Sequence, residues 1–271
     1  MKSITSVQRR KFAIGASAIA AASLFVHGQP AQAQSASRKR TFVLVHGAWH
    51  GGWCWKQVSQ ELAQEGHTVY APSLTGLADR SHLMREGIGL QTHIADIVNL
   101  IKWDDLNDVV LVGHSYAGMV ITGVAGELKN QISSIIYLDA LIPAQGQGAA
   151  DLTTAGVKAA LQKTMSEGKI SLPAPPATAF KLLPQNEALV TAKMTAQPIA
   201  TLLDPSPADI RKIDIAKKTF VRLQKYPHGK LDEYVAEIKQ LTSWNFVPLD
   251  VGHDMMVDHP AQLAKLLVQY S

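Results

Sequence analysis

The stretch Asp108-Val-Val-Leu-Val-Gly-His-Ser-Tyr-Ala-Gly118 decides the fold of this 271-residue chain. It opens with an apolar run, which is typical of a strand buried on both faces of a parallel sheet. A helical pattern follows from Met119, so the sequence predicts a strand, a sharp turn and a helix. Small residues at Gly113 and Ala117 allow the strand and the helix to approach closely. Such a turn projects the hydroxyl of Ser115 from the sheet, which makes Ser115 a candidate nucleophile.

The rest of the chain alternates between strand and helix patterns. Apolar or β-branched runs predict strands at residues 41–45, 68–71, 132–138, 219–223 and 245–249. Helical spacing predicts helices at residues 57–65, 92–103, 119–128 and 231–241, and a last helix from residue 260. This order is typical of an α/β fold with a mostly parallel sheet and helices on both faces. We expect one domain over residues 41–271, with no internal repeat.

Residues 141–217 interrupt the alternation. The segment contains a proline cluster at residues 173–176 and short helical pieces. A stretch of this length between two core strands is usually a functional insertion. We therefore expect a helical lid over the site.

The first 33 residues have the pattern of an export signal. A basic head that contains Arg9 and Arg10 precedes the apolar run 12–26, and Ala31-Gln-Ala33 matches a small-x-small cleavage site. The twin arginines are typical of a Tat-type signal. The alternative is an uncleaved membrane anchor, but the apolar run is short and a cleavage site follows it. We expect export to the bacterial periplasm or outside the cell, without stable membrane association after cleavage, and a flexible lead-in at residues 34–40.

The charge of the chain belongs to this signal. The formal net charge is +4, and residues 1–33 hold four Lys or Arg and no Asp or Glu. The remainder is therefore formally neutral, which argues against a nucleic-acid partner. The single cysteine, Cys54, excludes an intramolecular disulfide.

A glycine-rich loop follows the first expected strand. It reads His46-Gly-Ala-Trp-His-Gly-Gly-Trp53. Loops of this type donate a backbone N–H to the oxyanion of a tetrahedral intermediate, and the residue after the nucleophile donates the second. We expect the amides of Ala48 and Tyr116 to fill these roles, with Gly47, Trp49 and His50 at the substrate pocket. We expect neither a metal nor an organic cofactor, because nothing near His46 and His50 completes a ligand set.

The general base is expected in the loop after the last strand. His253 lies there, whereas His259 precedes a proline and is more typical of a helix cap. The expected acid is Asp139, which ends a strand and keeps the chain order Ser, Asp, His. Asp232 and Glu233 are the alternatives, because they follow the strand that usually carries the acid of this fold.

These motifs resemble the plant methylesterase and hydroxynitrile lyase branch of the α/β-hydrolases, and more closely its bacterial esterase relatives, which include pyrethroid and carbamate hydrolases. The resemblance covers nearly all of residues 41–270 and rests on residues 42–55, 74–77, 113–118 and 252–256. It implies catalytic roles for Ser115 and His253 in the hydrolysis of small carboxylic esters.

Two departures from the branch bear on the reaction. The lyases lack the glycine found here as Gly47 and carry a lysine beside the catalytic histidine, where this chain has Asp254. Both features favour ester hydrolysis over cyanohydrin cleavage, which stays the alternative within the fold. A small-molecule binding protein without turnover is the alternative from another class. Dehalogenases of a related branch place their acid where Asp139 lies, but Ser115 in place of an aspartate argues against dehalogenation.

Overall fold

A computed structural model describes residues 38–154, 156–227 and 229–271 of the chain. The predicted signal, residues 1–33, and the start of the lead-in lie outside these residues. Among the described helices, none has the length and apolar character needed to cross a membrane.

Six parallel strands form the central sheet, in the order β2-β1-β3-β4-β7-β8. The strands are β1 (Thr41–Val45), β2 (Thr68–Tyr70), β3 (Val109–His114), β4 (Ile132–Leu138), β7 (Lys217–Leu223) and β8 (Trp244–Leu249). The predicted α/β fold is confirmed, with shifts of one or two residues at most element ends.

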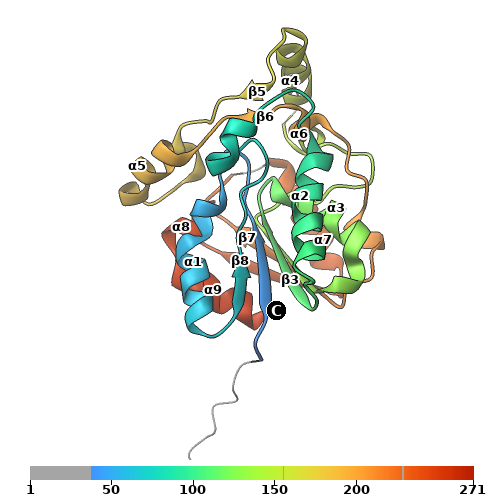
Figure 1. Ribbon diagram of the computed structural model, residues 1–271, viewed down its shortest axis with the longest axis vertical. Coiled ribbons are helices and arrows are strands. Elements are labelled where there is room, and N and C mark those ends of the chain that lie inside the picture. Colours follow the sequence, from blue (N-terminus) through green and yellow to red (C-terminus); the bar gives the residue numbers. More distant parts are fainter. Residues whose placement is uncertain (1–37, 155, 228) are drawn as a thin grey trace, which may run out of the picture. The chain divides into compact units, whose positions relative to one another are not determined.

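Helices cover both faces of this sheet (Figure 1). One face carries α1 (Lys56–Gln64), α8 (Met255–Asp258) and α9 (Pro260–Gln269), and the other carries α2 (Leu90–Trp103), α3 (Ala117–Leu128) and α7 (Gly229–Gln240). Strand β1 shows why both faces need cover: Phe42 and Leu44 are buried with the first group, while Val43 and Val45 are buried with the second. The apolar runs of the sequence are therefore strands with two buried faces.

Most of the long segment between β4 and β7 lies beyond the carboxyl ends of the strands, and its last residues return beside α3 to the start of β7 (Figure 1). It contains α4 (Val157–Ser166), α5 (Pro184–Lys193) and α6 (Ala200–Leu203). It also contains a small antiparallel pair, β5 (Ser171–Leu172) with β6 (Gln197–Pro198). We call this segment, residues 139–216, the lid.

The strand register brings the candidate residues to one edge of the sheet. Gly113 of β3 pairs with Val45 of β1 and with Tyr137 of β4, so these three strands end side by side. His46 directly follows β1, Ser115 follows β3 and Asp139 follows β4. Ligand sites of open α/β sheets form at this edge, beyond the carboxyl ends of the strands.

Candidate active site

Ser115 occupies a sharp turn between β3 and α3. Its φ is 54°, in the left-handed region that non-glycine residues seldom adopt. The turn is fixed through its backbone: Ser115 N–H donates to the Leu138 carbonyl at 3.1 Å, and the Ser115 carbonyl accepts from Leu141 N–H at 3.0 Å. A β-carbon on Gly118 would lie 1.9 Å from the Leu141 carbonyl oxygen. Glycine at position 118 therefore lets the start of the lid approach this turn.

His253 lies against Asp139. The distance from His253 Nδ1 to Asp139 Oδ2 is 2.7 Å, and each residue is only 2% exposed. Because a carboxylate accepts, Nδ1 carries the hydrogen, and Nε2 is left with a lone pair that can take a proton. The backbone N–H of His253 donates to the Phe180 carbonyl at 2.9 Å, so a lid residue also holds the loop.

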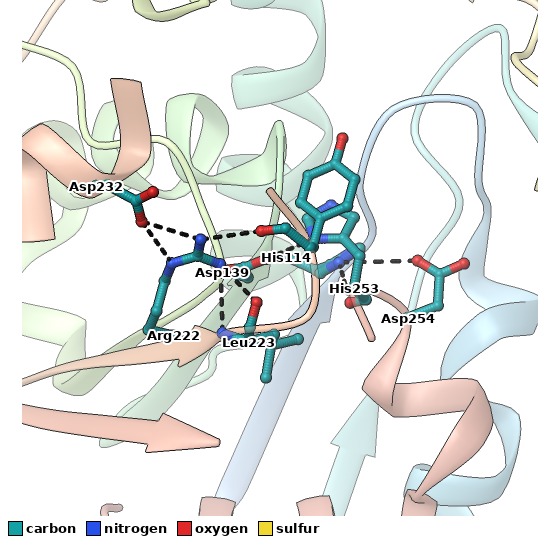
Figure 2. Close-up of polar contacts among 8 residues, drawn as sticks. His114, Asp139, Arg222, Leu223, Asp232, His253 and Asp254 are labelled. Carbon is teal, nitrogen blue, oxygen red and sulfur yellow. Dashed lines mark hydrogen bonds and ion pairs between the residues drawn. The ribbon is translucent and has the colours of Figure 1, made fainter. Parts of the chain in front are cut away.

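The second oxygen of Asp139 binds the end of β7. Asp139 Oδ1 accepts from Arg222 Nη1 at 2.9 Å and from Leu223 N–H at 3.1 Å. Figure 2 shows Arg222 between Asp139 and Asp232. Arg222 Nη2 donates to Asp232 Oδ1 at 3.0 Å. Of the three carboxylates considered from the sequence, Asp139 contacts His253. The side chain of Asp232 is 64% exposed and pairs with Arg222 instead, and Glu233 is exposed.

Aromatic rings confine the imidazole of His253. Tyr226 stacks on it with ring centroids 4.0 Å apart, and His114 lies at 4.4 Å. His114 Nε2 donates to the His253 carbonyl at 3.0 Å. Burial and the neighbouring His253 hold the pKa of His114 well below its usual value, so His114 stays neutral. The ring of His253 thus has little freedom to turn away from Asp139.

The loop after β1 passes close to Ser115. A β-carbon on Gly47 would lie 3.0 Å from Ser115 Cβ and 2.9 Å from His114 Nδ1, so only glycine fits there without displacement. The Gly47 carbonyl accepts from His46 Nδ1 at 2.9 Å, while His46 Nε2 accepts from Leu74 N–H at 2.9 Å. Burial lowers the pKa of His46 to about 3, which keeps this ring neutral and in one tautomer.

Two backbone amides are available beside Ser115. Within the described part of the chain, the N–H groups of Ala48 and Tyr116 donate to no protein group outside the regular helices and strands. Both residues line a cavity of about 180 Å³ that also reaches Ser115. The peptide bond between Gly47 and Ala48 has its carbonyl bound by His46 Nδ1. Because the carbonyl and the N–H of a trans peptide point in opposite directions, the Ala48 N–H points away from His46 Nδ1.

The same cavity is mostly apolar on its lid side, where Asp139 and Thr153 are the polar residues among the lining residues. The lid residues that line it include Leu141, Ala149, Ala150, Val157, Leu161, Leu172 and Leu202. Trp49 also lines it and is fixed by the lid, because its indole Nε1 donates to the Leu172 carbonyl at 3.2 Å. A small apolar group of a ligand would fit beside Ser115.

His50 is placed away from this cavity. It is 1% exposed, does not line the cavity, and its Nε2 lies 3.0 Å from Asp254 Oδ2. The ring packs against Trp53, His114 and Phe180. Gly47 does not line the cavity either, although its backbone lies close to the Ser115 side chain. His259 begins α9 as its N-cap residue, although its side chain makes no capping hydrogen bond.

Sequence reasoning missed several polar contacts of the site. They involve Arg222 at the end of β7, Gln197 and Thr195 in the lid, and the pair of His93 with the Tyr116 hydroxyl at 3.0 Å. No motif marks these residues as partners of the site, although Arg222 lies at a strand end that the sequence predicts. In the described residues, no group of three or more His, Cys, Asp or Glu side chains is arranged to hold a metal ion.

Comparison with known proteins places the chain in a family. The sequence profile described as "Alpha/beta hydrolase family" matches residues 42–266. The chain belongs to the α/β hydrolase family. A carbendazim hydrolyzing esterase from Nocardioides sp. (strain SG-4G) is 34% identical over 83% of this α/β hydrolase and 97% of that protein. Methylesterase 1 of Arabidopsis thaliana is 34% identical over 39% of this chain and 41% of its own length.

Solved structures agree with this assignment. An extracellular α/β-hydrolase from a Paenibacillus species aligns with a TM-score of 0.75 and 25% identity, over 86% of this α/β hydrolase and 99% of that chain. It is described as sharing structural and functional homology with tobacco salicylic acid binding protein 2. A pyrethroid hydrolase aligns with a TM-score of 0.61 and 16% identity, over 85% of this chain and 96% of that chain. This likeness shows the shared fold. The relatives identify this chain as a hydrolase of the esterase type.

Proposed function

We propose that this α/β hydrolase cleaves small carboxylic esters by acyl transfer, with Ser115 as nucleophile, His253 as general base and Asp139 as the acid that orients His253. One observation carries the proposal. The buried pair of His253 Nδ1 and Asp139 Oδ2, 2.7 Å apart, lies at the edge of the sheet where Ser115 follows β3. An esterase among the relatives supports the same chemistry.

The first half of the reaction forms an acyl-enzyme. His253 Nε2 takes the proton of Ser115 as Oγ attacks the ester carbonyl. The N–H groups of Ala48 and Tyr116 bind the oxyanion, and each such donor contributes about 3–4 kcal/mol of transition-state stabilisation. The amino end of α3, directly behind Ser115, favours the same negative charge.

The second half releases the acid. Protonated His253 donates its proton to the departing alcohol, and the same imidazole then activates a water that attacks the acyl-enzyme. Asp139 stabilises the imidazolium in both halves, and Arg222 keeps the Asp139 carboxylate in place. The cycle requires neither a metal nor an organic cofactor.

The cavity supports small esters as the proposed substrates. Its volume of about 180 Å³ and its apolar lid wall suit a short acyl or alkyl group beside Ser115. The carbendazim hydrolyzing esterase among the relatives extends the proposed range to compounds of the carbendazim kind.

The test is turnover of p-nitrophenyl acetate and butyrate by the purified protein. Ser115→Ala should lower kcat by about 10⁶-fold, because the nucleophile and its base act as a unit. Ser59→Ala is the matched control, since the Ser59 hydroxyl is also buried but lies in α1, and this variant should keep wild-type turnover. Turnover by Ser115→Ala within tenfold of the wild type would refute the assignment.

We also propose that the chain is exported before it acts, on the basis of the twin arginines and the cleavage pattern at residues 31–33. The extracellular Paenibacillus relative supports this location.

A further inference from the structure

A second buried pair of ionisable groups involves the loop after β1, residues 46–53, which we call the oxyanion loop. His50 Nε2 and Asp254 Oδ2 are 3.0 Å apart, and both side chains are almost completely buried. The two residues are 204 positions apart in the sequence. The reaction proposed above uses neither side chain, so a buried ion pair at this place needs another explanation.

The proton count of His50 follows from its neighbours. Its Nδ1 lies 2.8 Å from the Ala48 carbonyl oxygen, and its Nε2 faces the Asp254 carboxylate. A carbonyl and a carboxylate only accept hydrogen bonds, so both ring nitrogens must donate. His50 is therefore an imidazolium. Burial opposes the charge, but the charge of Asp254 and its hydrogen bond raise the pKa of His50 above its ordinary value.

The pair holds the peptide that follows the oxyanion donor. His50 binds the carbonyl of Ala48, and the N–H of the same peptide, on Trp49, donates to Gln197 Oε1 at 3.0 Å. Gln197 is fully buried, and its Nε2 donates to Thr201 Oγ1 at 2.7 Å. Both polar groups of the peptide between Ala48 and Trp49, its carbonyl and its N–H, are therefore held by buried side chains.

The pair also connects the oxyanion loop to the loop of the base. Asp254 directly follows His253 in the chain, and His50 lies two residues after Ala48. The ring of His50 is enclosed by Trp53, His114 and Phe180, with centroids at 5.4, 6.2 and 5.4 Å. A shift of either loop would therefore break the pair or expose one of its charges.

We propose that His50 and Asp254 are positioning residues, a buried ion pair that sets the Ala48 amide and the His253 loop in their working places relative to Ser115. The inference rests on the proposed esterase function. It assigns the pair to the oxyanion hole, so its loss should lower the rate of the chemical step more than it weakens substrate binding.

The pair gives the site a defined pH window. The other titratable groups around it are His46 after β1, His114 at the end of β3, the thiol of Cys54, His253 and the phenol of Tyr226. Burial and the charges of Asp139 and Asp254 raise the pKa of Tyr226, so this phenol stays neutral. Burial keeps His46 and His114 neutral and raises the pKa of Cys54, so Asp254 and His50 carry the facing charges.

The sign of the pH effect follows from the two shifts. The raised pKa of His50 means that its contribution to stability is fully present below the unfolded value of about 6.5 and is lost as pH rises through the folded pKa. Burial opposes ionisation of Asp254, but the charge and hydrogen bond of His50 hold its pKa below 3.8. Its contribution is therefore lost as pH falls through that lowered value.

Two substitutions of Asp254 separate the hydrogen bond from the charge. Asp254→Ala leaves Nε2 of His50 without a partner and frees the ring. In Asp254→Asn the carboxamide can donate to Nε2 of a neutral His50, whose Nδ1–H still binds the Ala48 carbonyl. We expect Asp254→Ala to lower kcat about 30-fold to 100-fold with KM within threefold, and Asp254→Asn to lose clearly less.

Three readouts report on the oxyanion hole and not on folding alone. The Ki of a trifluoromethyl ketone, which mimics the tetrahedral intermediate, should rise in Asp254→Ala by the factor that kcat/KM falls. In the wild type, kcat should decline as pH rises through the pKa of His50, and Asp254→Asn should abolish this decline. His67→Gln is the control, because it removes another buried imidazole, at the opposite end of β1, and should leave kcat unchanged.

The experiment can fail in two distinguishable ways. Absence of Ser115-dependent turnover in the wild type would remove the proposed function. A kcat within threefold of wild type for Asp254→Ala, or an alkaline decline that persists in Asp254→Asn, would overturn the positioning role.

The ¹⁵N NMR signals of His50, assigned with His50→Gln, test the pair without any turnover. Two protonated ring nitrogens at pH 7 support the ion pair, and one protonated nitrogen refutes it.

Discussion

At the scale of single residues, the carboxylate that holds His253 comes from the end of β4, and an arginine stands at the end of β7. Arg222 is buried and satisfies its donors with Asp139, Asp232 and the carbonyls of Leu223 and Tyr226. A buried guanidinium without such partners would be costly. The end of β7 therefore holds the Asp139 carboxylate through Arg222 and Leu223, while His253 contacts Asp139.

The first prediction concerns this acid. Asp139→Asn should lower kcat for p-nitrophenyl butyrate by about 10⁴-fold, because the amide no longer holds His253 in the tautomer that accepts a proton. Asp232→Asn is the control, since its exposed side chain touches Arg222 and not His253. A larger loss in Asp232→Asn than in Asp139→Asn would move the acid to the end of β7.

Single residues also show how far the sequence could predict the site. Ser115, Asp139 and His253 could be chosen because each lies directly after or close to a strand end, and buried strands are visible as apolar runs. The pair of His50 with Asp254 could not be predicted in this way. Hydrogen bonds between residues far apart in the chain follow from packing and leave no periodic pattern in the sequence.

At the scale of elements, the lid does two things for the site. It lines the apolar side of the cavity, and it holds the oxyanion loop through Gln197 and through Thr195, whose N–H donates to the Trp49 carbonyl at 2.9 Å. The sequence indicated an insertion at residues 141–217 because the strand and helix rhythm stops there. It could not indicate which lid side chains face Ser115, because short helices joined by loops have no common periodicity.

The second prediction tests the lid as the determinant of acyl size. Leu161 of α4 is 5% exposed and lines the cavity. Leu161→Ala enlarges the space beside Ser115, so the ratio of kcat/KM for p-nitrophenyl hexanoate over acetate should rise about tenfold, which matches the effect of a methylene or two in an apolar pocket. Leu189→Ala on α5, where the side chain is 45% exposed, should leave the ratio unchanged. An unchanged ratio in Leu161→Ala would remove α4 from the acyl pocket.

At the scale of the whole molecule, the parallel sheet brings distant segments to one edge. The ends of β1, β3 and β4 lie side by side by register, and the loop after β8 adds His253. This gathering was predictable, because strand order in a mostly parallel sheet leaves the carboxyl ends on one side. The signal predicted at residues 1–33 lies outside the described residues, so it is tested separately.

The third prediction concerns export. In a bacterial host with a Tat system, the wild-type chain should reach the periplasm or the medium with a new amino terminus near Gln34, as read by mass spectrometry. Replacement of the twin arginines, Arg9→Lys with Arg10→Lys, should keep the protein in the cytoplasm. Equal export of both chains would contradict a Tat-type signal.

The role of Ser115 as nucleophile is tested most directly by reacting the purified protein with a fluorophosphonate probe and mapping the modified residue by mass spectrometry. We expect one adduct per chain, on Ser115, formed much more slowly in Asp139→Asn and absent in Ser115→Ala. An adduct on another residue, or no adduct in a folded wild-type protein, would contradict this role.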